Sequence, residues 1–182
     1  MSGKLFYLMG ASGSGKDSLL QGCRSLLHPE DRTLIAHRFI TRSAGAGGEN
    51  HIHLTETEFR MRLKSGLFAL HWASHGHLYG ISSEINSWLA ANHNVIINGS
   101  REYLNRASEQ YQQLVPVMVN VDENLLRQRL VQRGRENEAE IEKRLTRHHT
   151  LLHAMPPQTL FIDNSSSLED GVQALLRIIK QH

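Results

Sequence analysis

The sequence predicts an α/β fold in which helices flank a parallel sheet that begins with a phosphate-binding loop. Short apolar runs alternate with longer helical patterns along the 182 residues, which is typical of βαβ units. The first apolar run, at 5–9, leads into a glycine-rich loop at 10–18 and then into a helical stretch at 18–27. Strand, loop and helix in this order are the context that a P-loop requires.

The remaining elements follow the same alternation and predict one domain. Its core is expected at 1–41 and 82–182. Further strands are expected at 34–39, 95–98, 115–121 and 160–163. Further helices are expected at 83–91, 103–113, 123–133, 138–153 and 168–180.

The section at about 42–81 breaks this alternation, and we interpret it as an inserted acceptor-binding subdomain. A glycine-rich loop opens it, and short strands are expected at 67–73 and 78–81. Between them a helix is expected at 56–64, with Thr55 as N-cap and Glu58 as its capping-box partner. The segment at about 134–140 is charged and poor in apolar residues, so it is interpreted as a helical lid over the phosphates.

The P-loop is predicted to bind a nucleotide through its backbone. Glycines let N–H groups turn inward without a Cβ clash, and the first helical turn completes an anion cradle. Lys16 adds a charge for the β- and γ-phosphates. The residues expected to hold the nucleotide are Gly10, Ala11, Ser12, Gly13, Ser14, Gly15, Lys16, Asp17 and Ser18.

Asp17 stands where a P-loop normally has the Ser or Thr that binds Mg²⁺. Its carboxylate suits Mg²⁺, either directly or through water. It also suits the helix N-terminus as a cap, with Ser18 then supplying the hydroxyl. Both readings stay open, and Asp17 and Ser18 are the expected metal ligands.

Composition excludes several classes of protein. The net charge of +2 does not call for a nucleic-acid partner, and neither a membrane span nor a signal peptide is expected. The lone Cys23 cannot form an internal disulfide, which favours the cytoplasm. The twelve histidines do not complete a zinc-site spacing and are expected at the surface or in the core. A homodimer is left open.

Several motifs in order give the chain a resemblance to the guanylate kinase superfamily, over about 5–179. They are the P-loop, Thr41-Arg42, Tyr79-Gly80, Arg129-Leu130, Arg133-Gly134 and Arg144-Leu145. Within the superfamily, the chain resembles the kinases that act on ribose 1,5-bisphosphate in phosphonate utilisation. The segments that carry this likeness are 15–18, 36–42, 49–53, 98–101 and 133–137.

The resemblance implies a P-loop NTPase fold and transfer of the ATP γ-phosphate, with Mg²⁺, to the 1-phosphate of ribose 1,5-bisphosphate. It implies catalytic roles for Lys16, Asp17, Arg133 and Arg144, and nucleotide contacts for Arg129 and Arg133; Arg135 is an extra arginine beside them. It implies that the acceptor is bound by Arg38, Arg42, His51, His71, Tyr79 and Arg101.

The chain departs from guanylate kinases where these enzymes recognise guanine. His71-Trp72-Ala73 replaces a Glu-Trp-Ala-like stretch, and the second guanine-reading carboxylate, expected after 98–99, is missing. A site without these groups is expected to lose guanine. Two alternatives stay open: a nucleoside monophosphate kinase that reads the base by other groups, and a non-catalytic module. The retained P-loop lysine and lid arginines make the module the weakest reading.

Overall fold

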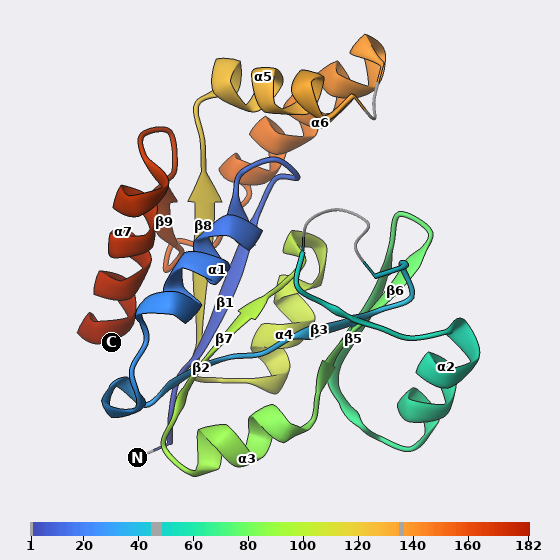
Figure 1. Ribbon diagram of the computed structural model, residues 1–182, viewed down its shortest axis with the longest axis vertical. Helices are drawn as coiled ribbons and strands as arrows, with labels where there is room; N and C mark the ends of the chain where they lie inside the picture. Colours follow the sequence, from blue (N-terminus) through green and yellow to red (C-terminus); the bar gives the residue numbers. More distant parts are fainter. Residues whose placement is uncertain (1, 45–48, 135–136) are drawn as a thin grey trace. The chain divides into compact units, whose positions relative to one another are not determined.

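The computed structural model describes residues 2–44, 49–134 and 137–182 (Figure 1). These residues form two compact units. One contains the chain up to Tyr7 together with Leu26–Leu114, and the other contains Leu8–Ser25 and Val115–His182. Strand β1 (Leu5–Gly10) contributes residues to both units.

The main sheet has five strands in the order β2-β7-β1-β8-β9, which confirms the predicted α/β fold. Strand β2 pairs with β7 in parallel, and β8 pairs with β9 in the same way. Val95–Ile97 and Val117–Val119 are fully buried, as expected for parallel strands covered on both faces. The strands that join β1 are β2 (Thr33–Ile35), β7 (Asn94–Asn98), β8 (Leu114–Asn120) and β9 (Leu160–Asp163).

In the second unit, α1 (Lys16–Leu26) and α7 (Leu168–Gln181) pack closely because each has a glycine at the contact. A Cβ on Gly22 would lie 2.6 Å from Val172 Cγ2, and one on Gly171 would lie 2.7 Å from Leu19 Cδ2. Larger side chains would push the helices apart, since the core is close-packed. Helix α1 begins two residues before the predicted start, at Lys16.

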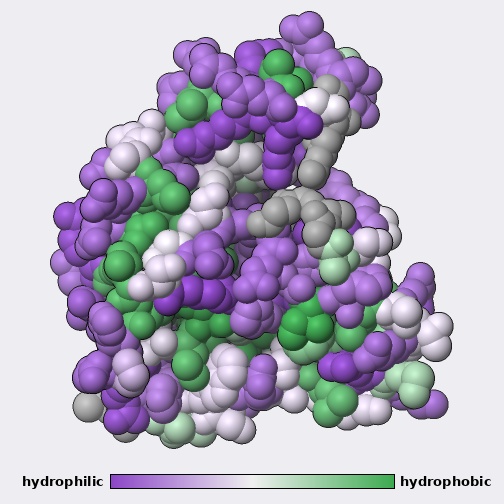
Figure 2. All heavy atoms as spheres, viewed as in Figure 1, coloured by the Kyte–Doolittle hydropathy of each residue, from purple (hydrophilic) through white to green (hydrophobic). Residues whose placement is uncertain are grey.

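Helices α5 (Glu123–Arg133) and α6 (Glu138–His153) complete the second unit and contact each other. Their shared core contains Leu126, Leu130, Ile141 and Leu145. Figure 2 shows mainly hydrophilic residues over both helices. Asn137 caps α6 in a capping box with Glu140, which the sequence did not predict.

The first unit has a second sheet, of order β4-β3-β6-β5, within the predicted insert and the residues before it. Strand β6 pairs antiparallel with both β3 and β5, so it lies between them. The predicted short strands are confirmed as β5 and β6, while the two-residue β4 was missed because its residues are exposed and carry no pattern. The strands are β3 (Arg38–Ile40), β4 (Ile52–His53), β5 (Phe68–Ser74) and β6 (His77–Ser82).

Helix α2 (Glu56–Lys64) has the predicted bounds and packs on this sheet through Phe59. The Phe59 ring stacks on Phe68 with centroids 4.5 Å apart. Thr55 caps the helix by accepting from the Glu58 N–H at 3.2 Å, as predicted. The capping box is a correction, because the Glu58 carboxylate accepts from Arg62 one turn later.

The predicted strand at 34–39 is also corrected: it forms β2 in one sheet and β3 in the other. Ala36 still donates to Ile96 O at 3.0 Å, and the chain then crosses to β6. The residue pattern at 34–39 does not reveal where the chain leaves one sheet and joins the other. The other helical segments of this unit are η1 (Pro29–Asp31), α3 (Glu84–Ala90), η2 (Arg101–Tyr103) and α4 (Leu104–Gln110).

Among the described residues, none of the helices combines the length and apolar character needed to cross a bilayer.

Phe59 is expected to anchor α2 to its sheet. Phe59→Ala should lower the free energy of unfolding by about 3–5 kcal/mol, because it removes a ring that is 1% exposed and leaves a cavity. Met61→Ala, on the same helix but 66% exposed, should change it by less than about 0.5 kcal/mol. Urea unfolding of both variants measures the difference, and equal losses would contradict this packing.

Candidate functional site

The loop between β1 and α1 has a shape that only glycine permits at two positions. Gly13 and Gly15 have φ of +95° and +89°, in the region that side chains disfavour. A Cβ on Gly15 would also lie 2.4 Å from Asn164 Nδ2. Ser14 N donates to Ala11 O at 3.1 Å and closes the turn. The backbone at the predicted phosphate-binding loop therefore has a conformation that depends on its glycines.

Lys16 is the first residue of α1, and its side chain turns back over this loop. Nζ donates to the carbonyl oxygens of Gly10 and Ala11, both at 2.9 Å. The ammonium group thus lies at the loop that the sequence predicts as a phosphate cradle. This is where the charge of a P-loop lysine is required.

Asp17 and Ser18 follow in the first turn of α1. Their carboxylate and hydroxyl are hard oxygen donors, so the donor set fits Mg²⁺. The same position suits an acidic side chain at the helix N-terminus. Both expectations for Asp17 therefore remain predictions.

Asn164 shapes the P-loop and was not identified from the sequence. Its side chain is buried, and Nδ2 donates to Ser14 O at 2.7 Å. Its backbone N–H donates to Asn120 O at 2.9 Å, which ties it to the end of β8. The one available signal was its place directly after the predicted strand at 160–163, since ligand sites lie beyond the carboxyl ends of parallel strands.

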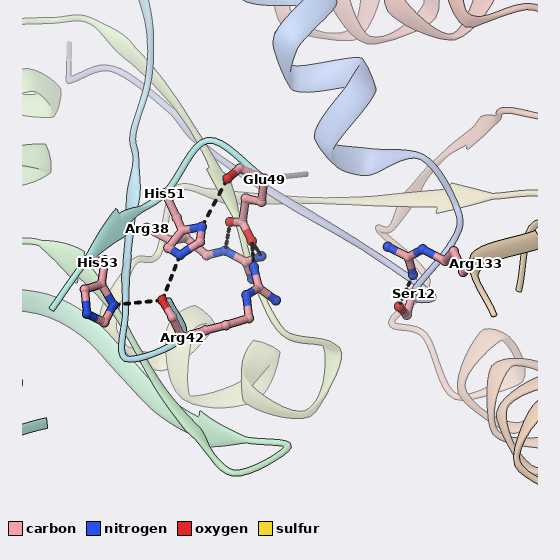
Figure 3. Close-up of polar contacts among 7 residues, drawn as sticks. All are labelled: Ser12, Arg38, Arg42, Glu49, His51, His53 and Arg133. Atoms are coloured by element: carbon pink, nitrogen blue, oxygen red, sulfur yellow. Dashed lines mark hydrogen bonds and ion pairs between the residues drawn. The ribbon is translucent and has the colours of Figure 1, made fainter. Parts of the chain in front are cut away.

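Two arginines of α5 also reach the P-loop. Arg133 Nη1 donates to Ser12 Oγ at 2.9 Å (Figure 3). Arg129 lies near Gly13 O at 3.5 Å and Asn164 O at 3.3 Å, which are weaker contacts. The structure thus brings both predicted nucleotide arginines to the loop.

Arg144 lies half-buried on α6. Arg135 and part of the expected lid at 134–140 fall outside the described residues.

In the first unit, a buried carboxylate joins two of the predicted acceptor arginines (Figure 3). Glu49 accepts from Arg38 Nε and Nη2, both at 2.5 Å, in a bidentate pair. It also accepts from Arg42 Nη2 at 3.0 Å. The Nε of Arg42 is buried and, among the residues that the structure describes, has no hydrogen-bond partner. Arg42 therefore keeps a donor for another group. Arg38, in contrast, uses both its Nε and its Nη2 to bind Glu49.

Glu49 stays ionised because the arginines outweigh the effect of burial. Burial alone would raise its pKa, but the hydrogen bonds from Arg38 and the charges of Arg38, Arg42 and His51 hold the pKa below its usual value. The cluster of two guanidinium groups and one carboxylate keeps a net positive charge. It can therefore still attract an anion.

Arg38 is also stacked against an aromatic row on one face of the small sheet. Its guanidinium carbon lies 5.2 Å from the Tyr79 ring centroid. Trp72 lies parallel to Tyr79, with centroids 5.5 Å apart and planes at 1°. Because β6 lies between β3 and β5, Tyr79 has Arg38 on one side and Trp72 on the other. The row fixes Arg38 independently of Glu49.

The predicted acceptor histidines are placed less favourably for binding an acceptor than the two arginines are. His51 faces two backbone carbonyls, with Nδ1 3.1 Å from Glu49 O and Nε2 3.0 Å from Arg42 O. His53 Nδ1 is 2.9 Å from the same Arg42 O. Both rings thus hold the backbone carbonyl of Arg42. His71 pairs with Gly80 and so lies on the opposite face from Tyr79, and the structure does not bring these two together.

Arg101 lies in η2, just past the carboxyl end of β7. This end of a parallel strand is where α/β sheets hold ligands. Within the described residues, the histidines do not join with Cys, Asp or Glu in any group of three able to hold a metal ion.

The guanylate kinase family model matches residues 2–182. The chain belongs to the guanylate kinase family. It is 49% identical to the ribose 1,5-bisphosphate phosphokinase PhnN of Desulfomicrobium baculatum, over 97% of this chain and 94% of that protein. It is 52% identical to the protein of the same name from Thiobacillus denitrificans, over 83% of this chain and 80% of that protein. The resemblance inferred from the motifs is confirmed.

The fold comparison agrees with this membership. The crystal structure of guanylate kinase from Anaplasma phagocytophilum superposes with a TM-score of 0.73 and covers 99% of this chain and 86% of that one. The two sequences are 16% identical, so the likeness concerns the fold alone.

Glu49→Gln is expected to destabilise the first unit by about 1–3 kcal/mol at pH 7, because two guanidinium groups lose their buried carboxylate. The folded pKa lies below the ordinary value of 4.5, so this contribution is present above that value and is lost as the pH falls through the folded pKa. The gap between wild type and variant should therefore be constant near neutrality and close in acid. Urea unfolding across a pH series measures it.

Glu56→Gln is the matched control, because it breaks an exposed pair with Arg60 in the same unit. It should change the free energy of unfolding by less than about 1 kcal/mol. A gap for Glu49→Gln that does not narrow as the pH is lowered through the acid range would contradict the role given to its charge.

Proposed function

We propose that the protein transfers the γ-phosphate of ATP to the 1-phosphate of ribose 1,5-bisphosphate, giving 5-phosphoribosyl 1-diphosphate and ADP in phosphonate utilisation. The observation that carries this proposal is an identity of about half over nearly the full chain with phosphokinases of that name. The P-loop geometry supports the nucleotide half of the reaction. We further propose a cytoplasmic location, where ATP is available.

The acceptor half is supported by the first unit. The ring of Tyr79 is covered by Arg38 and Trp72, so it does not offer a nucleobase a free stacking face. The carboxylates that would accept from guanine N–H groups are replaced, with His71 in one of their places. Arg42 and Arg101 instead suit an acceptor whose recognition rests on phosphate, because a guanidinium grips phosphate by two parallel hydrogen bonds.

The chemistry requires positioning more than proton transfer. An oxygen of the 1-phosphate is already anionic at neutral pH, so it attacks the γ-phosphorus without a general base. A new P–O bond forms to that oxygen, the bond to the β–γ bridging oxygen breaks, and ADP leaves with its electron pair. The chain must hold two anions together and offset their repulsion.

Lys16 and the arginines near the P-loop would supply this charge. Lys16 Nζ would exchange the carbonyls of Gly10 and Ala11 for phosphate oxygens. Arg129 and Arg133, which already reach the loop, would follow the nucleotide phosphates, and Arg144 would join them. Asp17 and Ser18 would hold Mg²⁺, which when bound neutralises charge on the β- and γ-phosphates.

The decisive experiment offers the protein ATP, Mg²⁺ and a panel of acceptors. Ribose 1,5-bisphosphate should be converted to 5-phosphoribosyl 1-diphosphate with a kcat/KM at least ~100-fold above that for GMP, because a site lacking the guanine partners cannot pair with the base. Coupled detection of ADP with product identification by mass spectrometry measures both. Comparable efficiency with GMP would favour a nucleoside monophosphate kinase.

The control for this panel is Lys16→Ala, which should abolish transfer to every acceptor while the fold survives. Transfer to no acceptor by the folded wild-type protein would instead favour a non-catalytic module.

The Asp17 side chain is expected to serve Mg²⁺ more than the helix end. Asp17→Ala should shift the Mg²⁺ concentration for half-maximal transfer upward by about ten-fold, with a smaller change in acceptor KM, because a hard oxygen ligand is lost. Asp17→Ser restores the hydroxyl usual at this position and should recover part of the shift. If the magnesium titration curves of the three proteins overlay, Asp17 serves only as a helix cap.

A further inference from the structure

Tyr7 is a buried phenol in the middle of β1, and its hydroxyl must find polar partners there. The side chain is fully buried, and so are its sequence neighbours Phe6 and Leu8 on the opposite face of the strand. A hydroxyl taken out of water without hydrogen bonds is costly. A phenylalanine would fill the same apolar space at no such cost, so the oxygen calls for a specific explanation.

The hydroxyl bonds both backbone groups of a single residue, Ser100. It donates to Ser100 O at 2.9 Å and accepts from Ser100 N–H at 3.0 Å. Burial raises the pKa of the phenol more than the bond to Ser100 lowers it, so the group remains a donor as well as an acceptor. One oxygen thus fixes the orientation of both peptide units that flank Ser100.

The segment held in this way leads directly into Arg101. Ser100 O also accepts from Tyr103 N–H at 3.0 Å, which is the bond that closes η2. On the other side, Gly99 lies against the Tyr7 ring, where a Cβ would be 2.2 Å from the ring atoms Cε1 and Cζ. The chain is therefore clamped immediately before Arg101, by the ring at Gly99 and by the hydroxyl at Ser100.

We propose that Tyr7 is a positioning residue for the acceptor: its hydroxyl holds the backbone at Ser100 so that Arg101 presents its guanidinium to a phosphate of the sugar bisphosphate. This inference rests on the proposed function. A guanidinium recognises phosphate through paired hydrogen bonds, so its backbone must be fixed to a fraction of an ångström. The clamp supplies that constraint before the acceptor arrives, which lowers the ordering cost of binding.

The variant that isolates the hydroxyl is Tyr7→Phe, which keeps the ring against Gly99 and removes both bonds to Ser100. The acceptor KM should rise roughly five- to ten-fold, as expected for two lost hydrogen bonds, while ATP affinity measured by calorimetry stays within two-fold (roughly 0.4 kcal/mol). Tyr111→Phe is the matched control, because it removes a hydroxyl that donates to Asn86 Oδ1 at 2.7 Å elsewhere in the same unit. It should leave both constants unchanged.

The link through Arg101 is tested by a double-mutant cycle. In an Arg101→Lys background, Tyr7→Phe should raise acceptor KM by less than about two-fold, because the group that it positions is already lost. Full additivity, or a Tyr7→Phe variant with the wild-type acceptor KM, overturns the inference.

Amide exchange gives a readout independent of activity and of the variant's folding. In the wild-type protein the Ser100 amide should exchange as slowly as its neighbours in β7, and Tyr7→Phe should accelerate it while Val95–Ile97 stay protected. Rapid exchange at Ser100 in the wild type overturns the clamp. A folded wild type that does not phosphorylate ribose 1,5-bisphosphate overturns the proposed function, whereas an active wild type with an unaffected Tyr7→Phe overturns this inference alone.

Discussion

A carboxylate buried between two arginines is the constraint on which the proposed acceptor half of this protein depends. Arg38 and Arg42 carry like charges and would repel each other without Glu49, which binds both. The pair with Arg38 is fixed further by the aromatic row of Tyr79 and Trp72. Arg42 is thus held by Glu49, whereas Arg38 contacts both Glu49 and the aromatic row on the small sheet. Burial makes the arrangement costly to break, in contrast to the exposed pairs of α2.

Parts of the molecule that are encoded by local chemistry could be predicted from the sequence. The P-loop needs glycines and a lysine at fixed spacing, and α2 needs a capping threonine and a helical pattern, so both were found. The parts encoded by contacts between distant residues could not. Asn164 meets Ser14 across 150 positions of sequence. Glu49 is separated from Arg38 in the sequence by a glycine-rich stretch, yet it pairs with that arginine. The prediction of a single strand at 34–39 was wrong for the same reason. Its two halves are distinguished by the strands with which they pair, which the sequence does not reveal.

The two candidate sites differ in how they are built, which explains why one was easier to find. The proposed nucleotide cradle would use backbone N–H groups of a loop that has Gly13 and Gly15 at positive φ. Glycine at such positions is a visible signal, since few other residues tolerate positive φ. The proposed acceptor residues contribute side chains from separate parts of the first unit, namely β3 and the chain after it, the strands β5 and β6, and η2. Arginine and histidine are common on any surface, so type alone does not distinguish a ligand from a brace, as His51 and Arg38 illustrate.

An acceptor that has no nucleobase must be recognised mainly through its phosphate groups. A base offers a stacking face and several directional donors, and a site can use these to reject a wrong acceptor. Phosphate offers only oxygens and charge, which every cation attracts, so discrimination must come from where the guanidinium groups are fixed. Rigid placement then takes the role that base pairing plays in a nucleotide kinase, and catalysis gains from the same rigidity because misplacement by an ångström is costly. This accounts for why the polar groups behind the arginines, Glu49 and the Tyr7 hydroxyl, are buried while the arginines themselves remain partly exposed.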